Sequence, residues 1–212
     1  RPAQSTKSLR SRRYASTERW RIALPSRPLG RPVAAYVEAH IEQGPILERE
    51  GRTIGIVTGI QGKRTFRVTV RGEEAHAGTS TPRERKDALL AAVRMIAALD
   101  DALRDGDDVV KFTVGRLDVT PNAPSVVAGT AVFSIDLRHV DSATLATLGD
   151  RIAGICAAEA SPCSVQVDEL TRASSLTFPT SMTSLVRESA KTLGIPAMDI
   201  FSAAGHDARF LH

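Results

Sequence analysis

One segment with strict alternation of apolar and polar residues, followed by a long helix and three further strands, constrains the fold of this chain most. Residues 65–71, TFRVTVR, place Phe66, Val68 and Val70 on one face of a strand and polar side chains on the other. A helix is predicted next, with Thr81 as its cap, Pro82 at its first position and Glu84 completing a capping box. This helix is expected to end at Asp105-Gly106.

Two strands, a second helix and a last strand complete the pattern. The strands are predicted over 109–119 and 130–138, the second helix begins at the cap Asp141, and the last strand spans 163–167. The predicted inward-facing side chains are Leu89, Val93, Ile96 and Leu103 of the first helix, Ala131, Phe133, Ile135 and Leu137 of the strand, and Leu145, Leu148, Ile152 and Ile155 of the second helix. The order β-α-β-β-α-β predicts a ferredoxin-like sandwich, with one antiparallel sheet and both helices on one face.

Shorter elements are predicted on both sides of this unit. Val37, Ala39 and Ile41 alternate with polar residues, which predicts a strand that delivers His40 to one face. A short helix, PILERE, follows and is closed by Gly51. A strand over 54–57 then leads to a turn at Gly59 and Gly62, and a further helix is predicted over 181–193.

Composition excludes several classes of protein. The 212 residues are 42% hydrophobic and 25% charged, which argues against wholesale disorder. No apolar run reaches the ~18 residues of a membrane-spanning helix. Cys156 and Cys163 cannot build a disulfide scaffold; they could pair, but reduced packing thiols are the preferred interpretation.

The basic charge of the chain is concentrated in its first 32 residues. This head holds nine Lys and Arg against the single acid Glu18, a charge of +8, whereas the rest of the chain carries −4. Its composition is compatible with a nucleic-acid or membrane-surface arm, with a mitochondrial transit peptide, or with a disordered or aberrant end that has no function. The third interpretation is preferred.

Two histidines stand in settings that suit metal binding. His40 precedes a Gly-Pro turn in AHIEQGP, and His206 follows small residues and precedes a carboxylate in SAAGHDA. Each of them alone is more often structural than functional. Nucleophile elbows, phosphate-binding glycine loops and dinucleotide fingerprints are absent from the sequence. The remaining histidines, carboxylates and arginine suit metal-assisted hydrolysis or a site for a small polar ligand.

Five segments occur together in a recognisable order: YVEAHIEQGPILE, IGIVTGIQG, HAGTSTPRERKDAL, PNAPSVVAG with DLRH, and AGHDA. They resemble the amidohydrolase branch of the dinuclear metallopeptidase superfamily, which includes N-carbamoyl-L-amino acid hydrolases, β-ureidopropionases and allantoate amidohydrolases. The resemblance covers about residues 33–211. It implies an α/β fold, in which a partial zinc-exopeptidase-like α/β/α catalytic domain carries the ferredoxin-like unit as an inserted lid and dimerisation domain.

The resemblance also implies roles for individual residues. The implied site residues are His40 and His206 as ligands of two divalent metal ions (Zn, Mn, Co or Ni), and His76, Asn122, Arg138 and Gln43 as substrate contacts, the first three of these often from the neighbouring subunit. The chemistry agrees, because Arg138 can hold a substrate carboxylate in a bidentate fork and His76 can donate to a developing oxyanion.

The family pattern is incomplete in this chain. A His-x-Asp ligand, a bridging aspartate and a Glu-Glu pair that contains the general base precede HIEQG in the family, and residues 1–39 contain nothing like them. We therefore expect no catalytic base, poor metal occupancy and weak or absent activity from this chain by itself. The expected division is a basic head (1–32), a catalytic segment (33–62), the lid (63–171) and a truncated second catalytic segment (172–212).

Two hypotheses of different class follow. The first is a cytoplasmic metal-dependent hydrolase of linear amides, which cleaves C–N bonds other than peptide bonds in substrates that carry a carboxylate. The second is a non-catalytic dimerisation or ligand-binding module derived from such an enzyme. The missing acidic ligands favour the second for this polypeptide and the first for its ancestry. The expected protein partner is a second copy of the chain, bound through the lid, and neither nucleic acid nor membrane is expected to bind.

Overall fold

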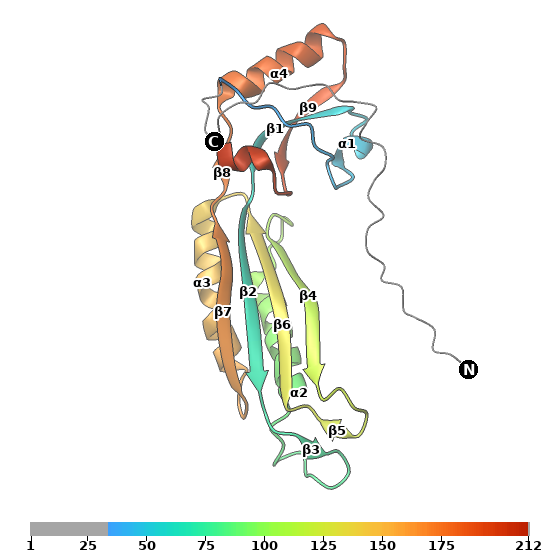
Figure 1. Ribbon diagram of the computed structural model, residues 1–212, viewed down its shortest axis with the longest axis vertical. Coiled ribbons are helices and arrows are strands. Elements are labelled where there is room, and N and C mark those ends of the chain that lie inside the picture. The colour runs from blue at the N-terminus through green and yellow to red at the C-terminus, as the bar shows by residue number, and fades with distance from the viewer. Residues whose placement is uncertain (1–33, 212) are drawn as a thin grey trace, which may run out of the picture. The chain divides into compact units, whose positions relative to one another are not determined.

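The computed structural model describes residues 34–211, so the predicted basic head, residues 1–32, lies outside the described residues. The described elements, labelled in Figure 1 where there is room, are α1 (Ile46–Arg49), β1 (Ile54–Ile60), β2 (Gly62–Arg71), β3 (Ala75–His76), α2 (Ala88–Leu103), β4 (Lys111–Thr120), β5 (Val126–Val127), β6 (Thr130–His139), α3 (Ser142–Ala158), β7 (Ser164–Ala173), β8 (Leu176–Thr177), α4 (Thr180–Thr192), β9 (Ala197–Ser202) and the 3-10 helix η2 (Asp207–Leu211).

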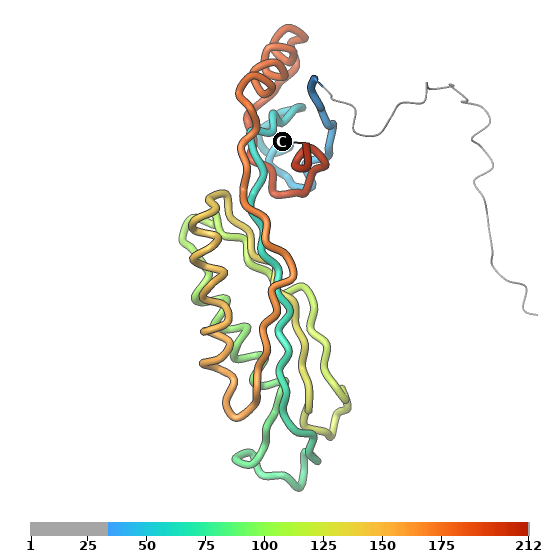
Figure 2. Tube along the Cα trace, turned by 60° about the vertical axis from the view of Figure 1, so that its left-hand side comes forward, coloured from blue at the N-terminus to red at the C-terminus, as the bar shows by residue number. Residues whose placement is uncertain are grey.

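Four long strands form one antiparallel sheet in the order β4-β6-β2-β7. The central strands β2 and β6 pair without interruption, from Gly62 opposite His139 to Arg71 opposite Thr130. Helices α2 and α3 cover the same face of this sheet (Figures 1 and 2). The predicted ferredoxin-like unit is therefore confirmed. The two short strands β3 and β5, which pair with each other, were not predicted.

The hydrophobic core lies between this sheet and its two helices. Phe66, Val68 and Val70 are buried, as their alternation predicted, and the register places Phe66 opposite Ile135 and Val68 opposite Phe133. Burial of a side chain of this size contributes about 1.5–3 kcal/mol. The prediction for α3 is also confirmed, because Asp141 caps the helix by accepting the N–H of Thr144 at 2.9 Å.

The predicted start of α2 is wrong. The helix begins at Ala88, and its cap is Asp87, which accepts the N–H of Leu90 at 3.0 Å. The hydroxyl of Thr81 instead donates to the Glu84 carboxylate at 2.8 Å within a separate turn. The polar side chains of the apparent capping box thus bond to each other locally and do not begin a helix.

The buried face of α2 is also displaced from the predicted one. The buried residues are Ala88, Ala91, Ala92, Met95, Leu99 and Leu103, whereas Val93 is 49% exposed. Only Leu103 of the four predicted residues is fully buried, and Ile96 is partly buried against the core. The small alanine side chains allow the helix backbone to approach the sheet closely, so alanine takes core positions that the sequence pattern assigned to larger residues.

A second sheet has three strands in the order β8-β1-β9. Strands β1 and β9 are parallel, and β8 pairs antiparallel with the end of β1 at Gly59 and Ile60. The helix predicted over 181–193 is confirmed as α4, which contacts β1 and β9. The sequence analysis did not predict β8, β9 or η2.

Two predictions next to this sheet are wrong. Residues 37–41 do not form a strand, and Val37 and Ile41, on its expected inward face, are 68% and 74% exposed. Gly59 and Gly62 do not form a turn, because they lie in β1 and β2 with only Gln61 between these strands. The glycine at 59 serves close packing, since a Cβ there would lie 2.4 Å from the ring of Phe201.

A buried arginine ties α3 to the four-stranded sheet. Arg64 of β2 is 3% exposed, and its guanidinium donates to Glu169, to Asp150 and to the backbone oxygen of Ala146 at 2.7–3.0 Å. Gly149 of α3 leaves room for this group, because a Cβ there would lie 2.3 Å from Nη1 of Arg64. Burial of the Arg64 charge is tolerated because its N–H groups donate to two carboxylates and a backbone oxygen.

The expectations about cysteines and membrane helices can be compared with the described residues. Cys156 and Cys163 do not pair in the structure, in agreement with the interpretation of unpaired packing thiols. Burial raises the pKa of Cys156 to about 11. Among residues 34–211, every helix is too short or too polar to cross a bilayer.

Candidate metal centre

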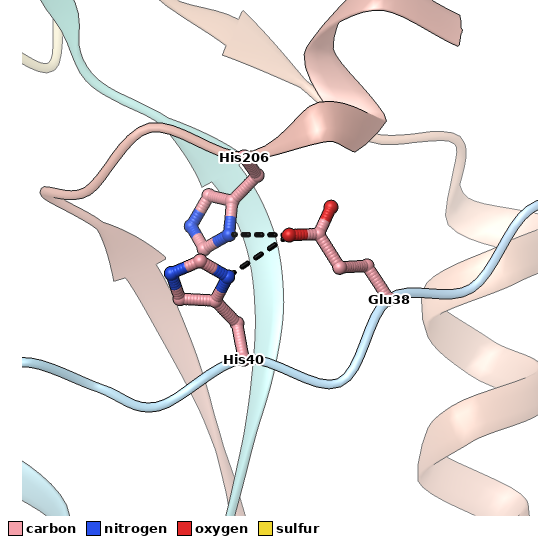
Figure 3. A group of neighbouring side chains, drawn as sticks. All are labelled: Glu38, His40 and His206. Carbon is pink, nitrogen blue, oxygen red and sulfur yellow. Dashed lines mark hydrogen bonds and ion pairs between the residues drawn. The ribbon is translucent and has the colours of Figure 1, made fainter. Parts of the chain in front are cut away.

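Glu38 and His40 meet His206, which is far from them in the sequence, beside the three-stranded sheet (Figure 3). Glu38 and His40 lie in the extended segment before α1, and His206 lies in the loop between β9 and η2. Each residue offers one ligand atom, and these atoms all lie within 4.8 Å of one another. No other group of three His, Cys, Asp or Glu side chains with this spacing occurs within residues 34–211.

Glu38 lies between the two imidazoles. Its Oε1 is 2.9 Å from Nδ1 of His40 and 3.8 Å from Nδ1 of His206. The two rings meet edge to face, with centroids 4.4 Å apart and an interplanar angle of 72°. Oε2 of the same carboxylate accepts the backbone N–H of Ala208 at 3.0 Å. One carboxylate therefore contacts both histidines and the start of η2.

The surroundings favour an ionised Glu38 and a neutral His206. The N–H of Ala208 lowers the pKa of Glu38, with further lowering from His40 and His206. Burial lowers the pKa of His206, and the nearby His40 adds to that effect. Metal ligands must bind as carboxylate and neutral imidazole, so both directions suit a cation site.

Ser202 holds the ring of His206 from its other side. The Ser202 hydroxyl is hydrogen-bonded to Nε2 of His206 and also accepts the backbone N–H of Ala204 at 3.1 Å. Hydrogen bonding to the second ring nitrogen is the usual way in which proteins orient a metal-binding histidine. The His206 side chain is only 8% exposed, which restricts the ring further.

The donor set fits a divalent transition metal. Two imidazole nitrogens and one carboxylate oxygen are ligands that Zn²⁺, Mn²⁺, Co²⁺ and Ni²⁺ all accept. Three protein ligands also leave a position for water or substrate, as in catalytic zinc sites. The residues of the structure therefore fit the metal that the sequence pattern implied.

Glu38 is the residue that the sequence analysis missed. Alternation in an extended segment places residues 38 and 40 on the same side, so the spacing of Glu38 from His40 was the available signal. The sequence analysis instead noted the neighbours that follow His40. Of these, Glu42 accepts the N–H groups of Ile46 and Leu47 at 2.7 and 3.0 Å and so caps α1. Gln43 is exposed in the turn before α1, with φ of +57°.

The Arg138 side chain is hydrogen-bonded to the backbone of the loop that carries His206. Its Nη1 donates to the oxygen of Ala203, three residues before His206, at 2.6 Å. Nε and Nη2 donate to both oxygens of Asp136 at 2.7 and 3.0 Å, and this bond raises the pKa of the guanidinium. A substrate carboxylate would therefore have to displace Asp136 or share the guanidinium with it.

His76 and Asn122 lie at the other end of the four-stranded sheet. Arg138 is opposite Lys63 at the start of β2, whereas His76 is in β3, beyond Arg71 at its end. Asn122, with φ of +57°, follows β4 at that same end. A strand of ten residues spans roughly 30 Å, so His76 and Asn122 lie far from His40 and His206 of the same chain.

Comparisons with known proteins agree with this architecture. Residues 58–162 match the family described as "Peptidase dimerisation domain". The chain is 40% identical over 179 residues to an N-carbamoyl-L-amino-acid amidohydrolase of Paenarthrobacter aurescens, and 36% identical over 183 residues to an allantoate amidohydrolase of Bacillus subtilis. These alignments cover 84% of this chain and 43–44% of the relatives. A crystal structure of a hydantoinase/carbamoylase family amidase from Burkholderia vietnamiensis superposes with a TM-score of 0.76 at 38% identity, over 81% of this chain and 42% of that chain.

The fold and the cluster thus define a unit that matches a peptidase dimerisation domain, joined to a three-stranded sheet beside which Glu38, His40 and His206 could hold a metal ion. The resemblance seen in the sequence is confirmed, because the homologues of this chain are named N-carbamoyl-L-amino-acid and allantoate amidohydrolases and residues 58–162 match a peptidase dimerisation domain. The chain spans less than half the length of the curated relatives that it matches. Members of the family are in general dinuclear and metal-dependent.

Proposed function

We propose that the protein is a metal-dependent amidohydrolase that cleaves a C–N bond in linear amides of the N-carbamoyl-amino acid or allantoate type. The single observation that carries this proposal is that Glu38 and His40 meet His206, which lies 168 and 166 residues further along the chain. The names of the relatives support the substrate class, since they are N-carbamoyl-L-amino-acid and allantoate amidohydrolases.

The three clustered residues would hold the metal. When bound there, a divalent cation would supply Lewis acidity toward water and the scissile carbonyl group. Glu38 would remain ionised and in contact with both imidazoles, and Ser202 would keep the ring of His206 in place. Zn²⁺, Mn²⁺, Co²⁺ and Ni²⁺ are all compatible with this donor set, and two ions are the family's usual complement.

The proposed substrate contacts divide into two groups by position. Arg138 would bind the substrate carboxylate beside the centre, with Gln43 lining the same cleft. His76 would donate a hydrogen bond to the oxyanion, and Asn122 would bind a substrate carbonyl or amide group. Because His76 and Asn122 lie at the far end of β2 and β4, we propose that a second copy of the chain supplies them.

This division of labour requires a homodimer. We propose that residues 63–171, which contain the four-stranded sheet, form the lid and dimerisation domain, and that residues 33–62 and 172–212 contribute to the catalytic domain. The match of residues 58–162 to a dimerisation domain supports this assignment. Size-exclusion chromatography with light scattering tests it, and a monomer at high protein concentration would contradict it.

The runner-up function is a non-catalytic metal- or ligand-binding module. It is favoured by one observation: within residues 34–211, the cluster contains a single carboxylate, and both oxygens of that carboxylate already have partners. Hydrolysis needs a general base in addition to ligands. In this module, metal binding would occur without turnover.

One assay separates the two functions. The purified chain is incubated with N-carbamoyl amino acids or allantoate in the presence of Mn²⁺, Co²⁺ or Zn²⁺, and the product is quantified. Turnover well above that of a His206→Ala variant supports the hydrolase. Equal background in both proteins, together with metal binding that only the unsubstituted chain shows, supports the binding module.

A further inference from the structure

The backbone of its own turn determines which ring nitrogen of a neutral His76 imidazole carries the proton. Nδ1 lies 3.0 Å from the backbone N–H of Gly78, which can only donate. In a neutral imidazole one nitrogen accepts and the other donates, so Nδ1 must be unprotonated and Nε2 must carry the proton. His76 is exposed, and its Nε2–H is therefore presented outward as a hydrogen-bond donor.

The turn that provides this N–H is folded back on His76. The backbone oxygen of His76 accepts the N–H of Ser80 at 3.1 Å and its hydroxyl at 2.8 Å. A Cβ at Gly78 would lie 3.3 Å from Cε1 of His76, so the glycine allows this close approach. Ala77, which follows His76, donates its N–H to the backbone oxygen of Ser125 at 2.9 Å. The turn is thus tied to the segment before β5.

Arg85 closes the turn with three hydrogen bonds. Its Nη2 donates to the backbone oxygens of Ala77 and Ser80 at 2.5 and 3.0 Å, and its Nε donates to the hydroxyl of Ser80 at 3.1 Å. A planar guanidinium can satisfy these acceptors together, whereas the single ammonium group of lysine lacks that geometry. Arg85 itself precedes α2, whose first residue, Ala88, is fully buried in the core.

We propose that Arg85 is the positioning residue for His76. Arg85 fixes the turn over residues 77–80, the turn places the N–H of Gly78 on Nδ1, and that bond fixes the Nε2–H of His76 as the donor. Nothing in this chain of contacts requires Arg85 to touch substrate. The contribution of Arg85 to catalysis rests on the proposed function, in which His76 stabilises an oxyanion. The effect of Arg85 on the His76 ring is independent of that function.

The test measures the ring directly by NMR of the full chain labelled with ¹⁵N-histidine. In the unsubstituted chain, the two ring nitrogens should give the pattern of a single Nε2–H tautomer with a hydrogen-bonded Nδ1. In Arg85→Gln, the Nδ1 shift should move at least halfway toward that of a peptide of residues 73–80. Hydrogen exchange of the Gly78 amide should become about tenfold faster, as loss of one hydrogen bond predicts.

Matched variants make the result decisive. Arg83→Gln removes a neighbouring exposed arginine and should leave the ring shifts and the Gly78 exchange rate unchanged. Arg85→Lys keeps the charge and provides a second test if Arg85→Gln does not fold. Its ring shifts and Gly78 exchange rate should change part of the way toward those expected for Arg85→Gln. Unchanged ring shifts in a folded Arg85→Gln, or full retention of the wild-type pattern in Arg85→Lys, would overturn the proposal.

A kinetic measurement adds the catalytic consequence. Wherever turnover can be measured, Arg85→Gln should lower kcat about tenfold and change KM less than threefold, because a misplaced donor acts mainly on the transition state. An equal loss in kcat and rise in KM would contradict the positioning role. The NMR result needs no turnover, so failure of the proposed hydrolase function would be distinguishable from failure of this inference.

Discussion

Substitution of Gly149 by alanine should destabilise the protein, although helix propensity alone predicts the reverse. Gly149 lies in the interior of α3, where alanine is favoured over glycine by about 0.8–1 kcal/mol. In this structure, however, the added Cβ would lie 2.3–2.6 Å from Nη1, Cζ and Nε of Arg64. The buried guanidinium would have to move.

The cost of that movement can be worked from its contacts. Arg64 donates four hydrogen bonds, three of them to the carboxylates of Glu169 and Asp150. A hydrogen bond to a charged group contributes about 1.5–3 kcal/mol. Glu169 keeps a second partner in Arg172, which offsets part of the loss. A net destabilisation of about 3 kcal/mol is therefore expected for Gly149→Ala.

Urea denaturation followed by circular dichroism measures this loss of unfolding free energy. In thermal denaturation, Tm should fall by roughly 10 °C. The matched control is Gly154→Ala in the same helix, where a Cβ would meet nothing within 4 Å. This control should be stabilised by up to about 1 kcal/mol. If Gly149→Ala is as stable as Gly154→Ala, the guanidinium does not occupy the space described and the reasoning is refuted.

Three shorter predictions follow from the same structure. The hydrogen bonds from Arg172 and Arg64 lower the pKa of Glu169 from 4.5 to about 2, so the stabilisation that they give the folded protein is complete above pH 4.5 and is lost as the pH falls toward 2. The expected loss of unfolding free energy is on the order of 1–2 kcal/mol after solvent screening. Urea denaturation at several pH values should show this pH dependence in the unsubstituted chain and not in Glu169→Gln. Asp141→Ala removes the cap of α3 and should cost about 1 kcal/mol in the same assay. Glu38→Gln should weaken Zn²⁺ binding about 10- to 100-fold by calorimetry without unfolding the chain.

The elements with one clear face could be predicted from the sequence. The alternation over 65–71 predicted β2 and its buried residues, and Asp141 predicted the start of α3. In both cases a local pattern and the tertiary packing favour the same structure. The start of α2 was wrong because two good caps, Thr81 and Asp87, lie six residues apart, and packing of the alanine face selected the second.

The metal cluster could be predicted only in part. His40 and His206 were identified through motifs in a fixed order, and the structure brings them together. Glu38 was missed because residues 37–41 were interpreted as a strand with an apolar inward face. In the structure the polar face of that segment points to His206, and the apolar side chains are exposed. The two-residue spacing of Glu38 from His40 was the one local signal, because the contact of Glu38 with His206, 168 residues away, leaves none.

The central claim is that Glu38, His40 and His206 form one cation site. Titration of the purified chain with Co²⁺, followed by visible absorption, tests it most directly, because the intensity and position of the bands report the ligand geometry. The account predicts saturable bands of a nitrogen- and oxygen-ligated ion that are lost in His40→Ala and His206→Ala but kept in Arg83→Gln. Bands of equal intensity in the histidine variants, or no saturable binding by the unsubstituted chain, would contradict it.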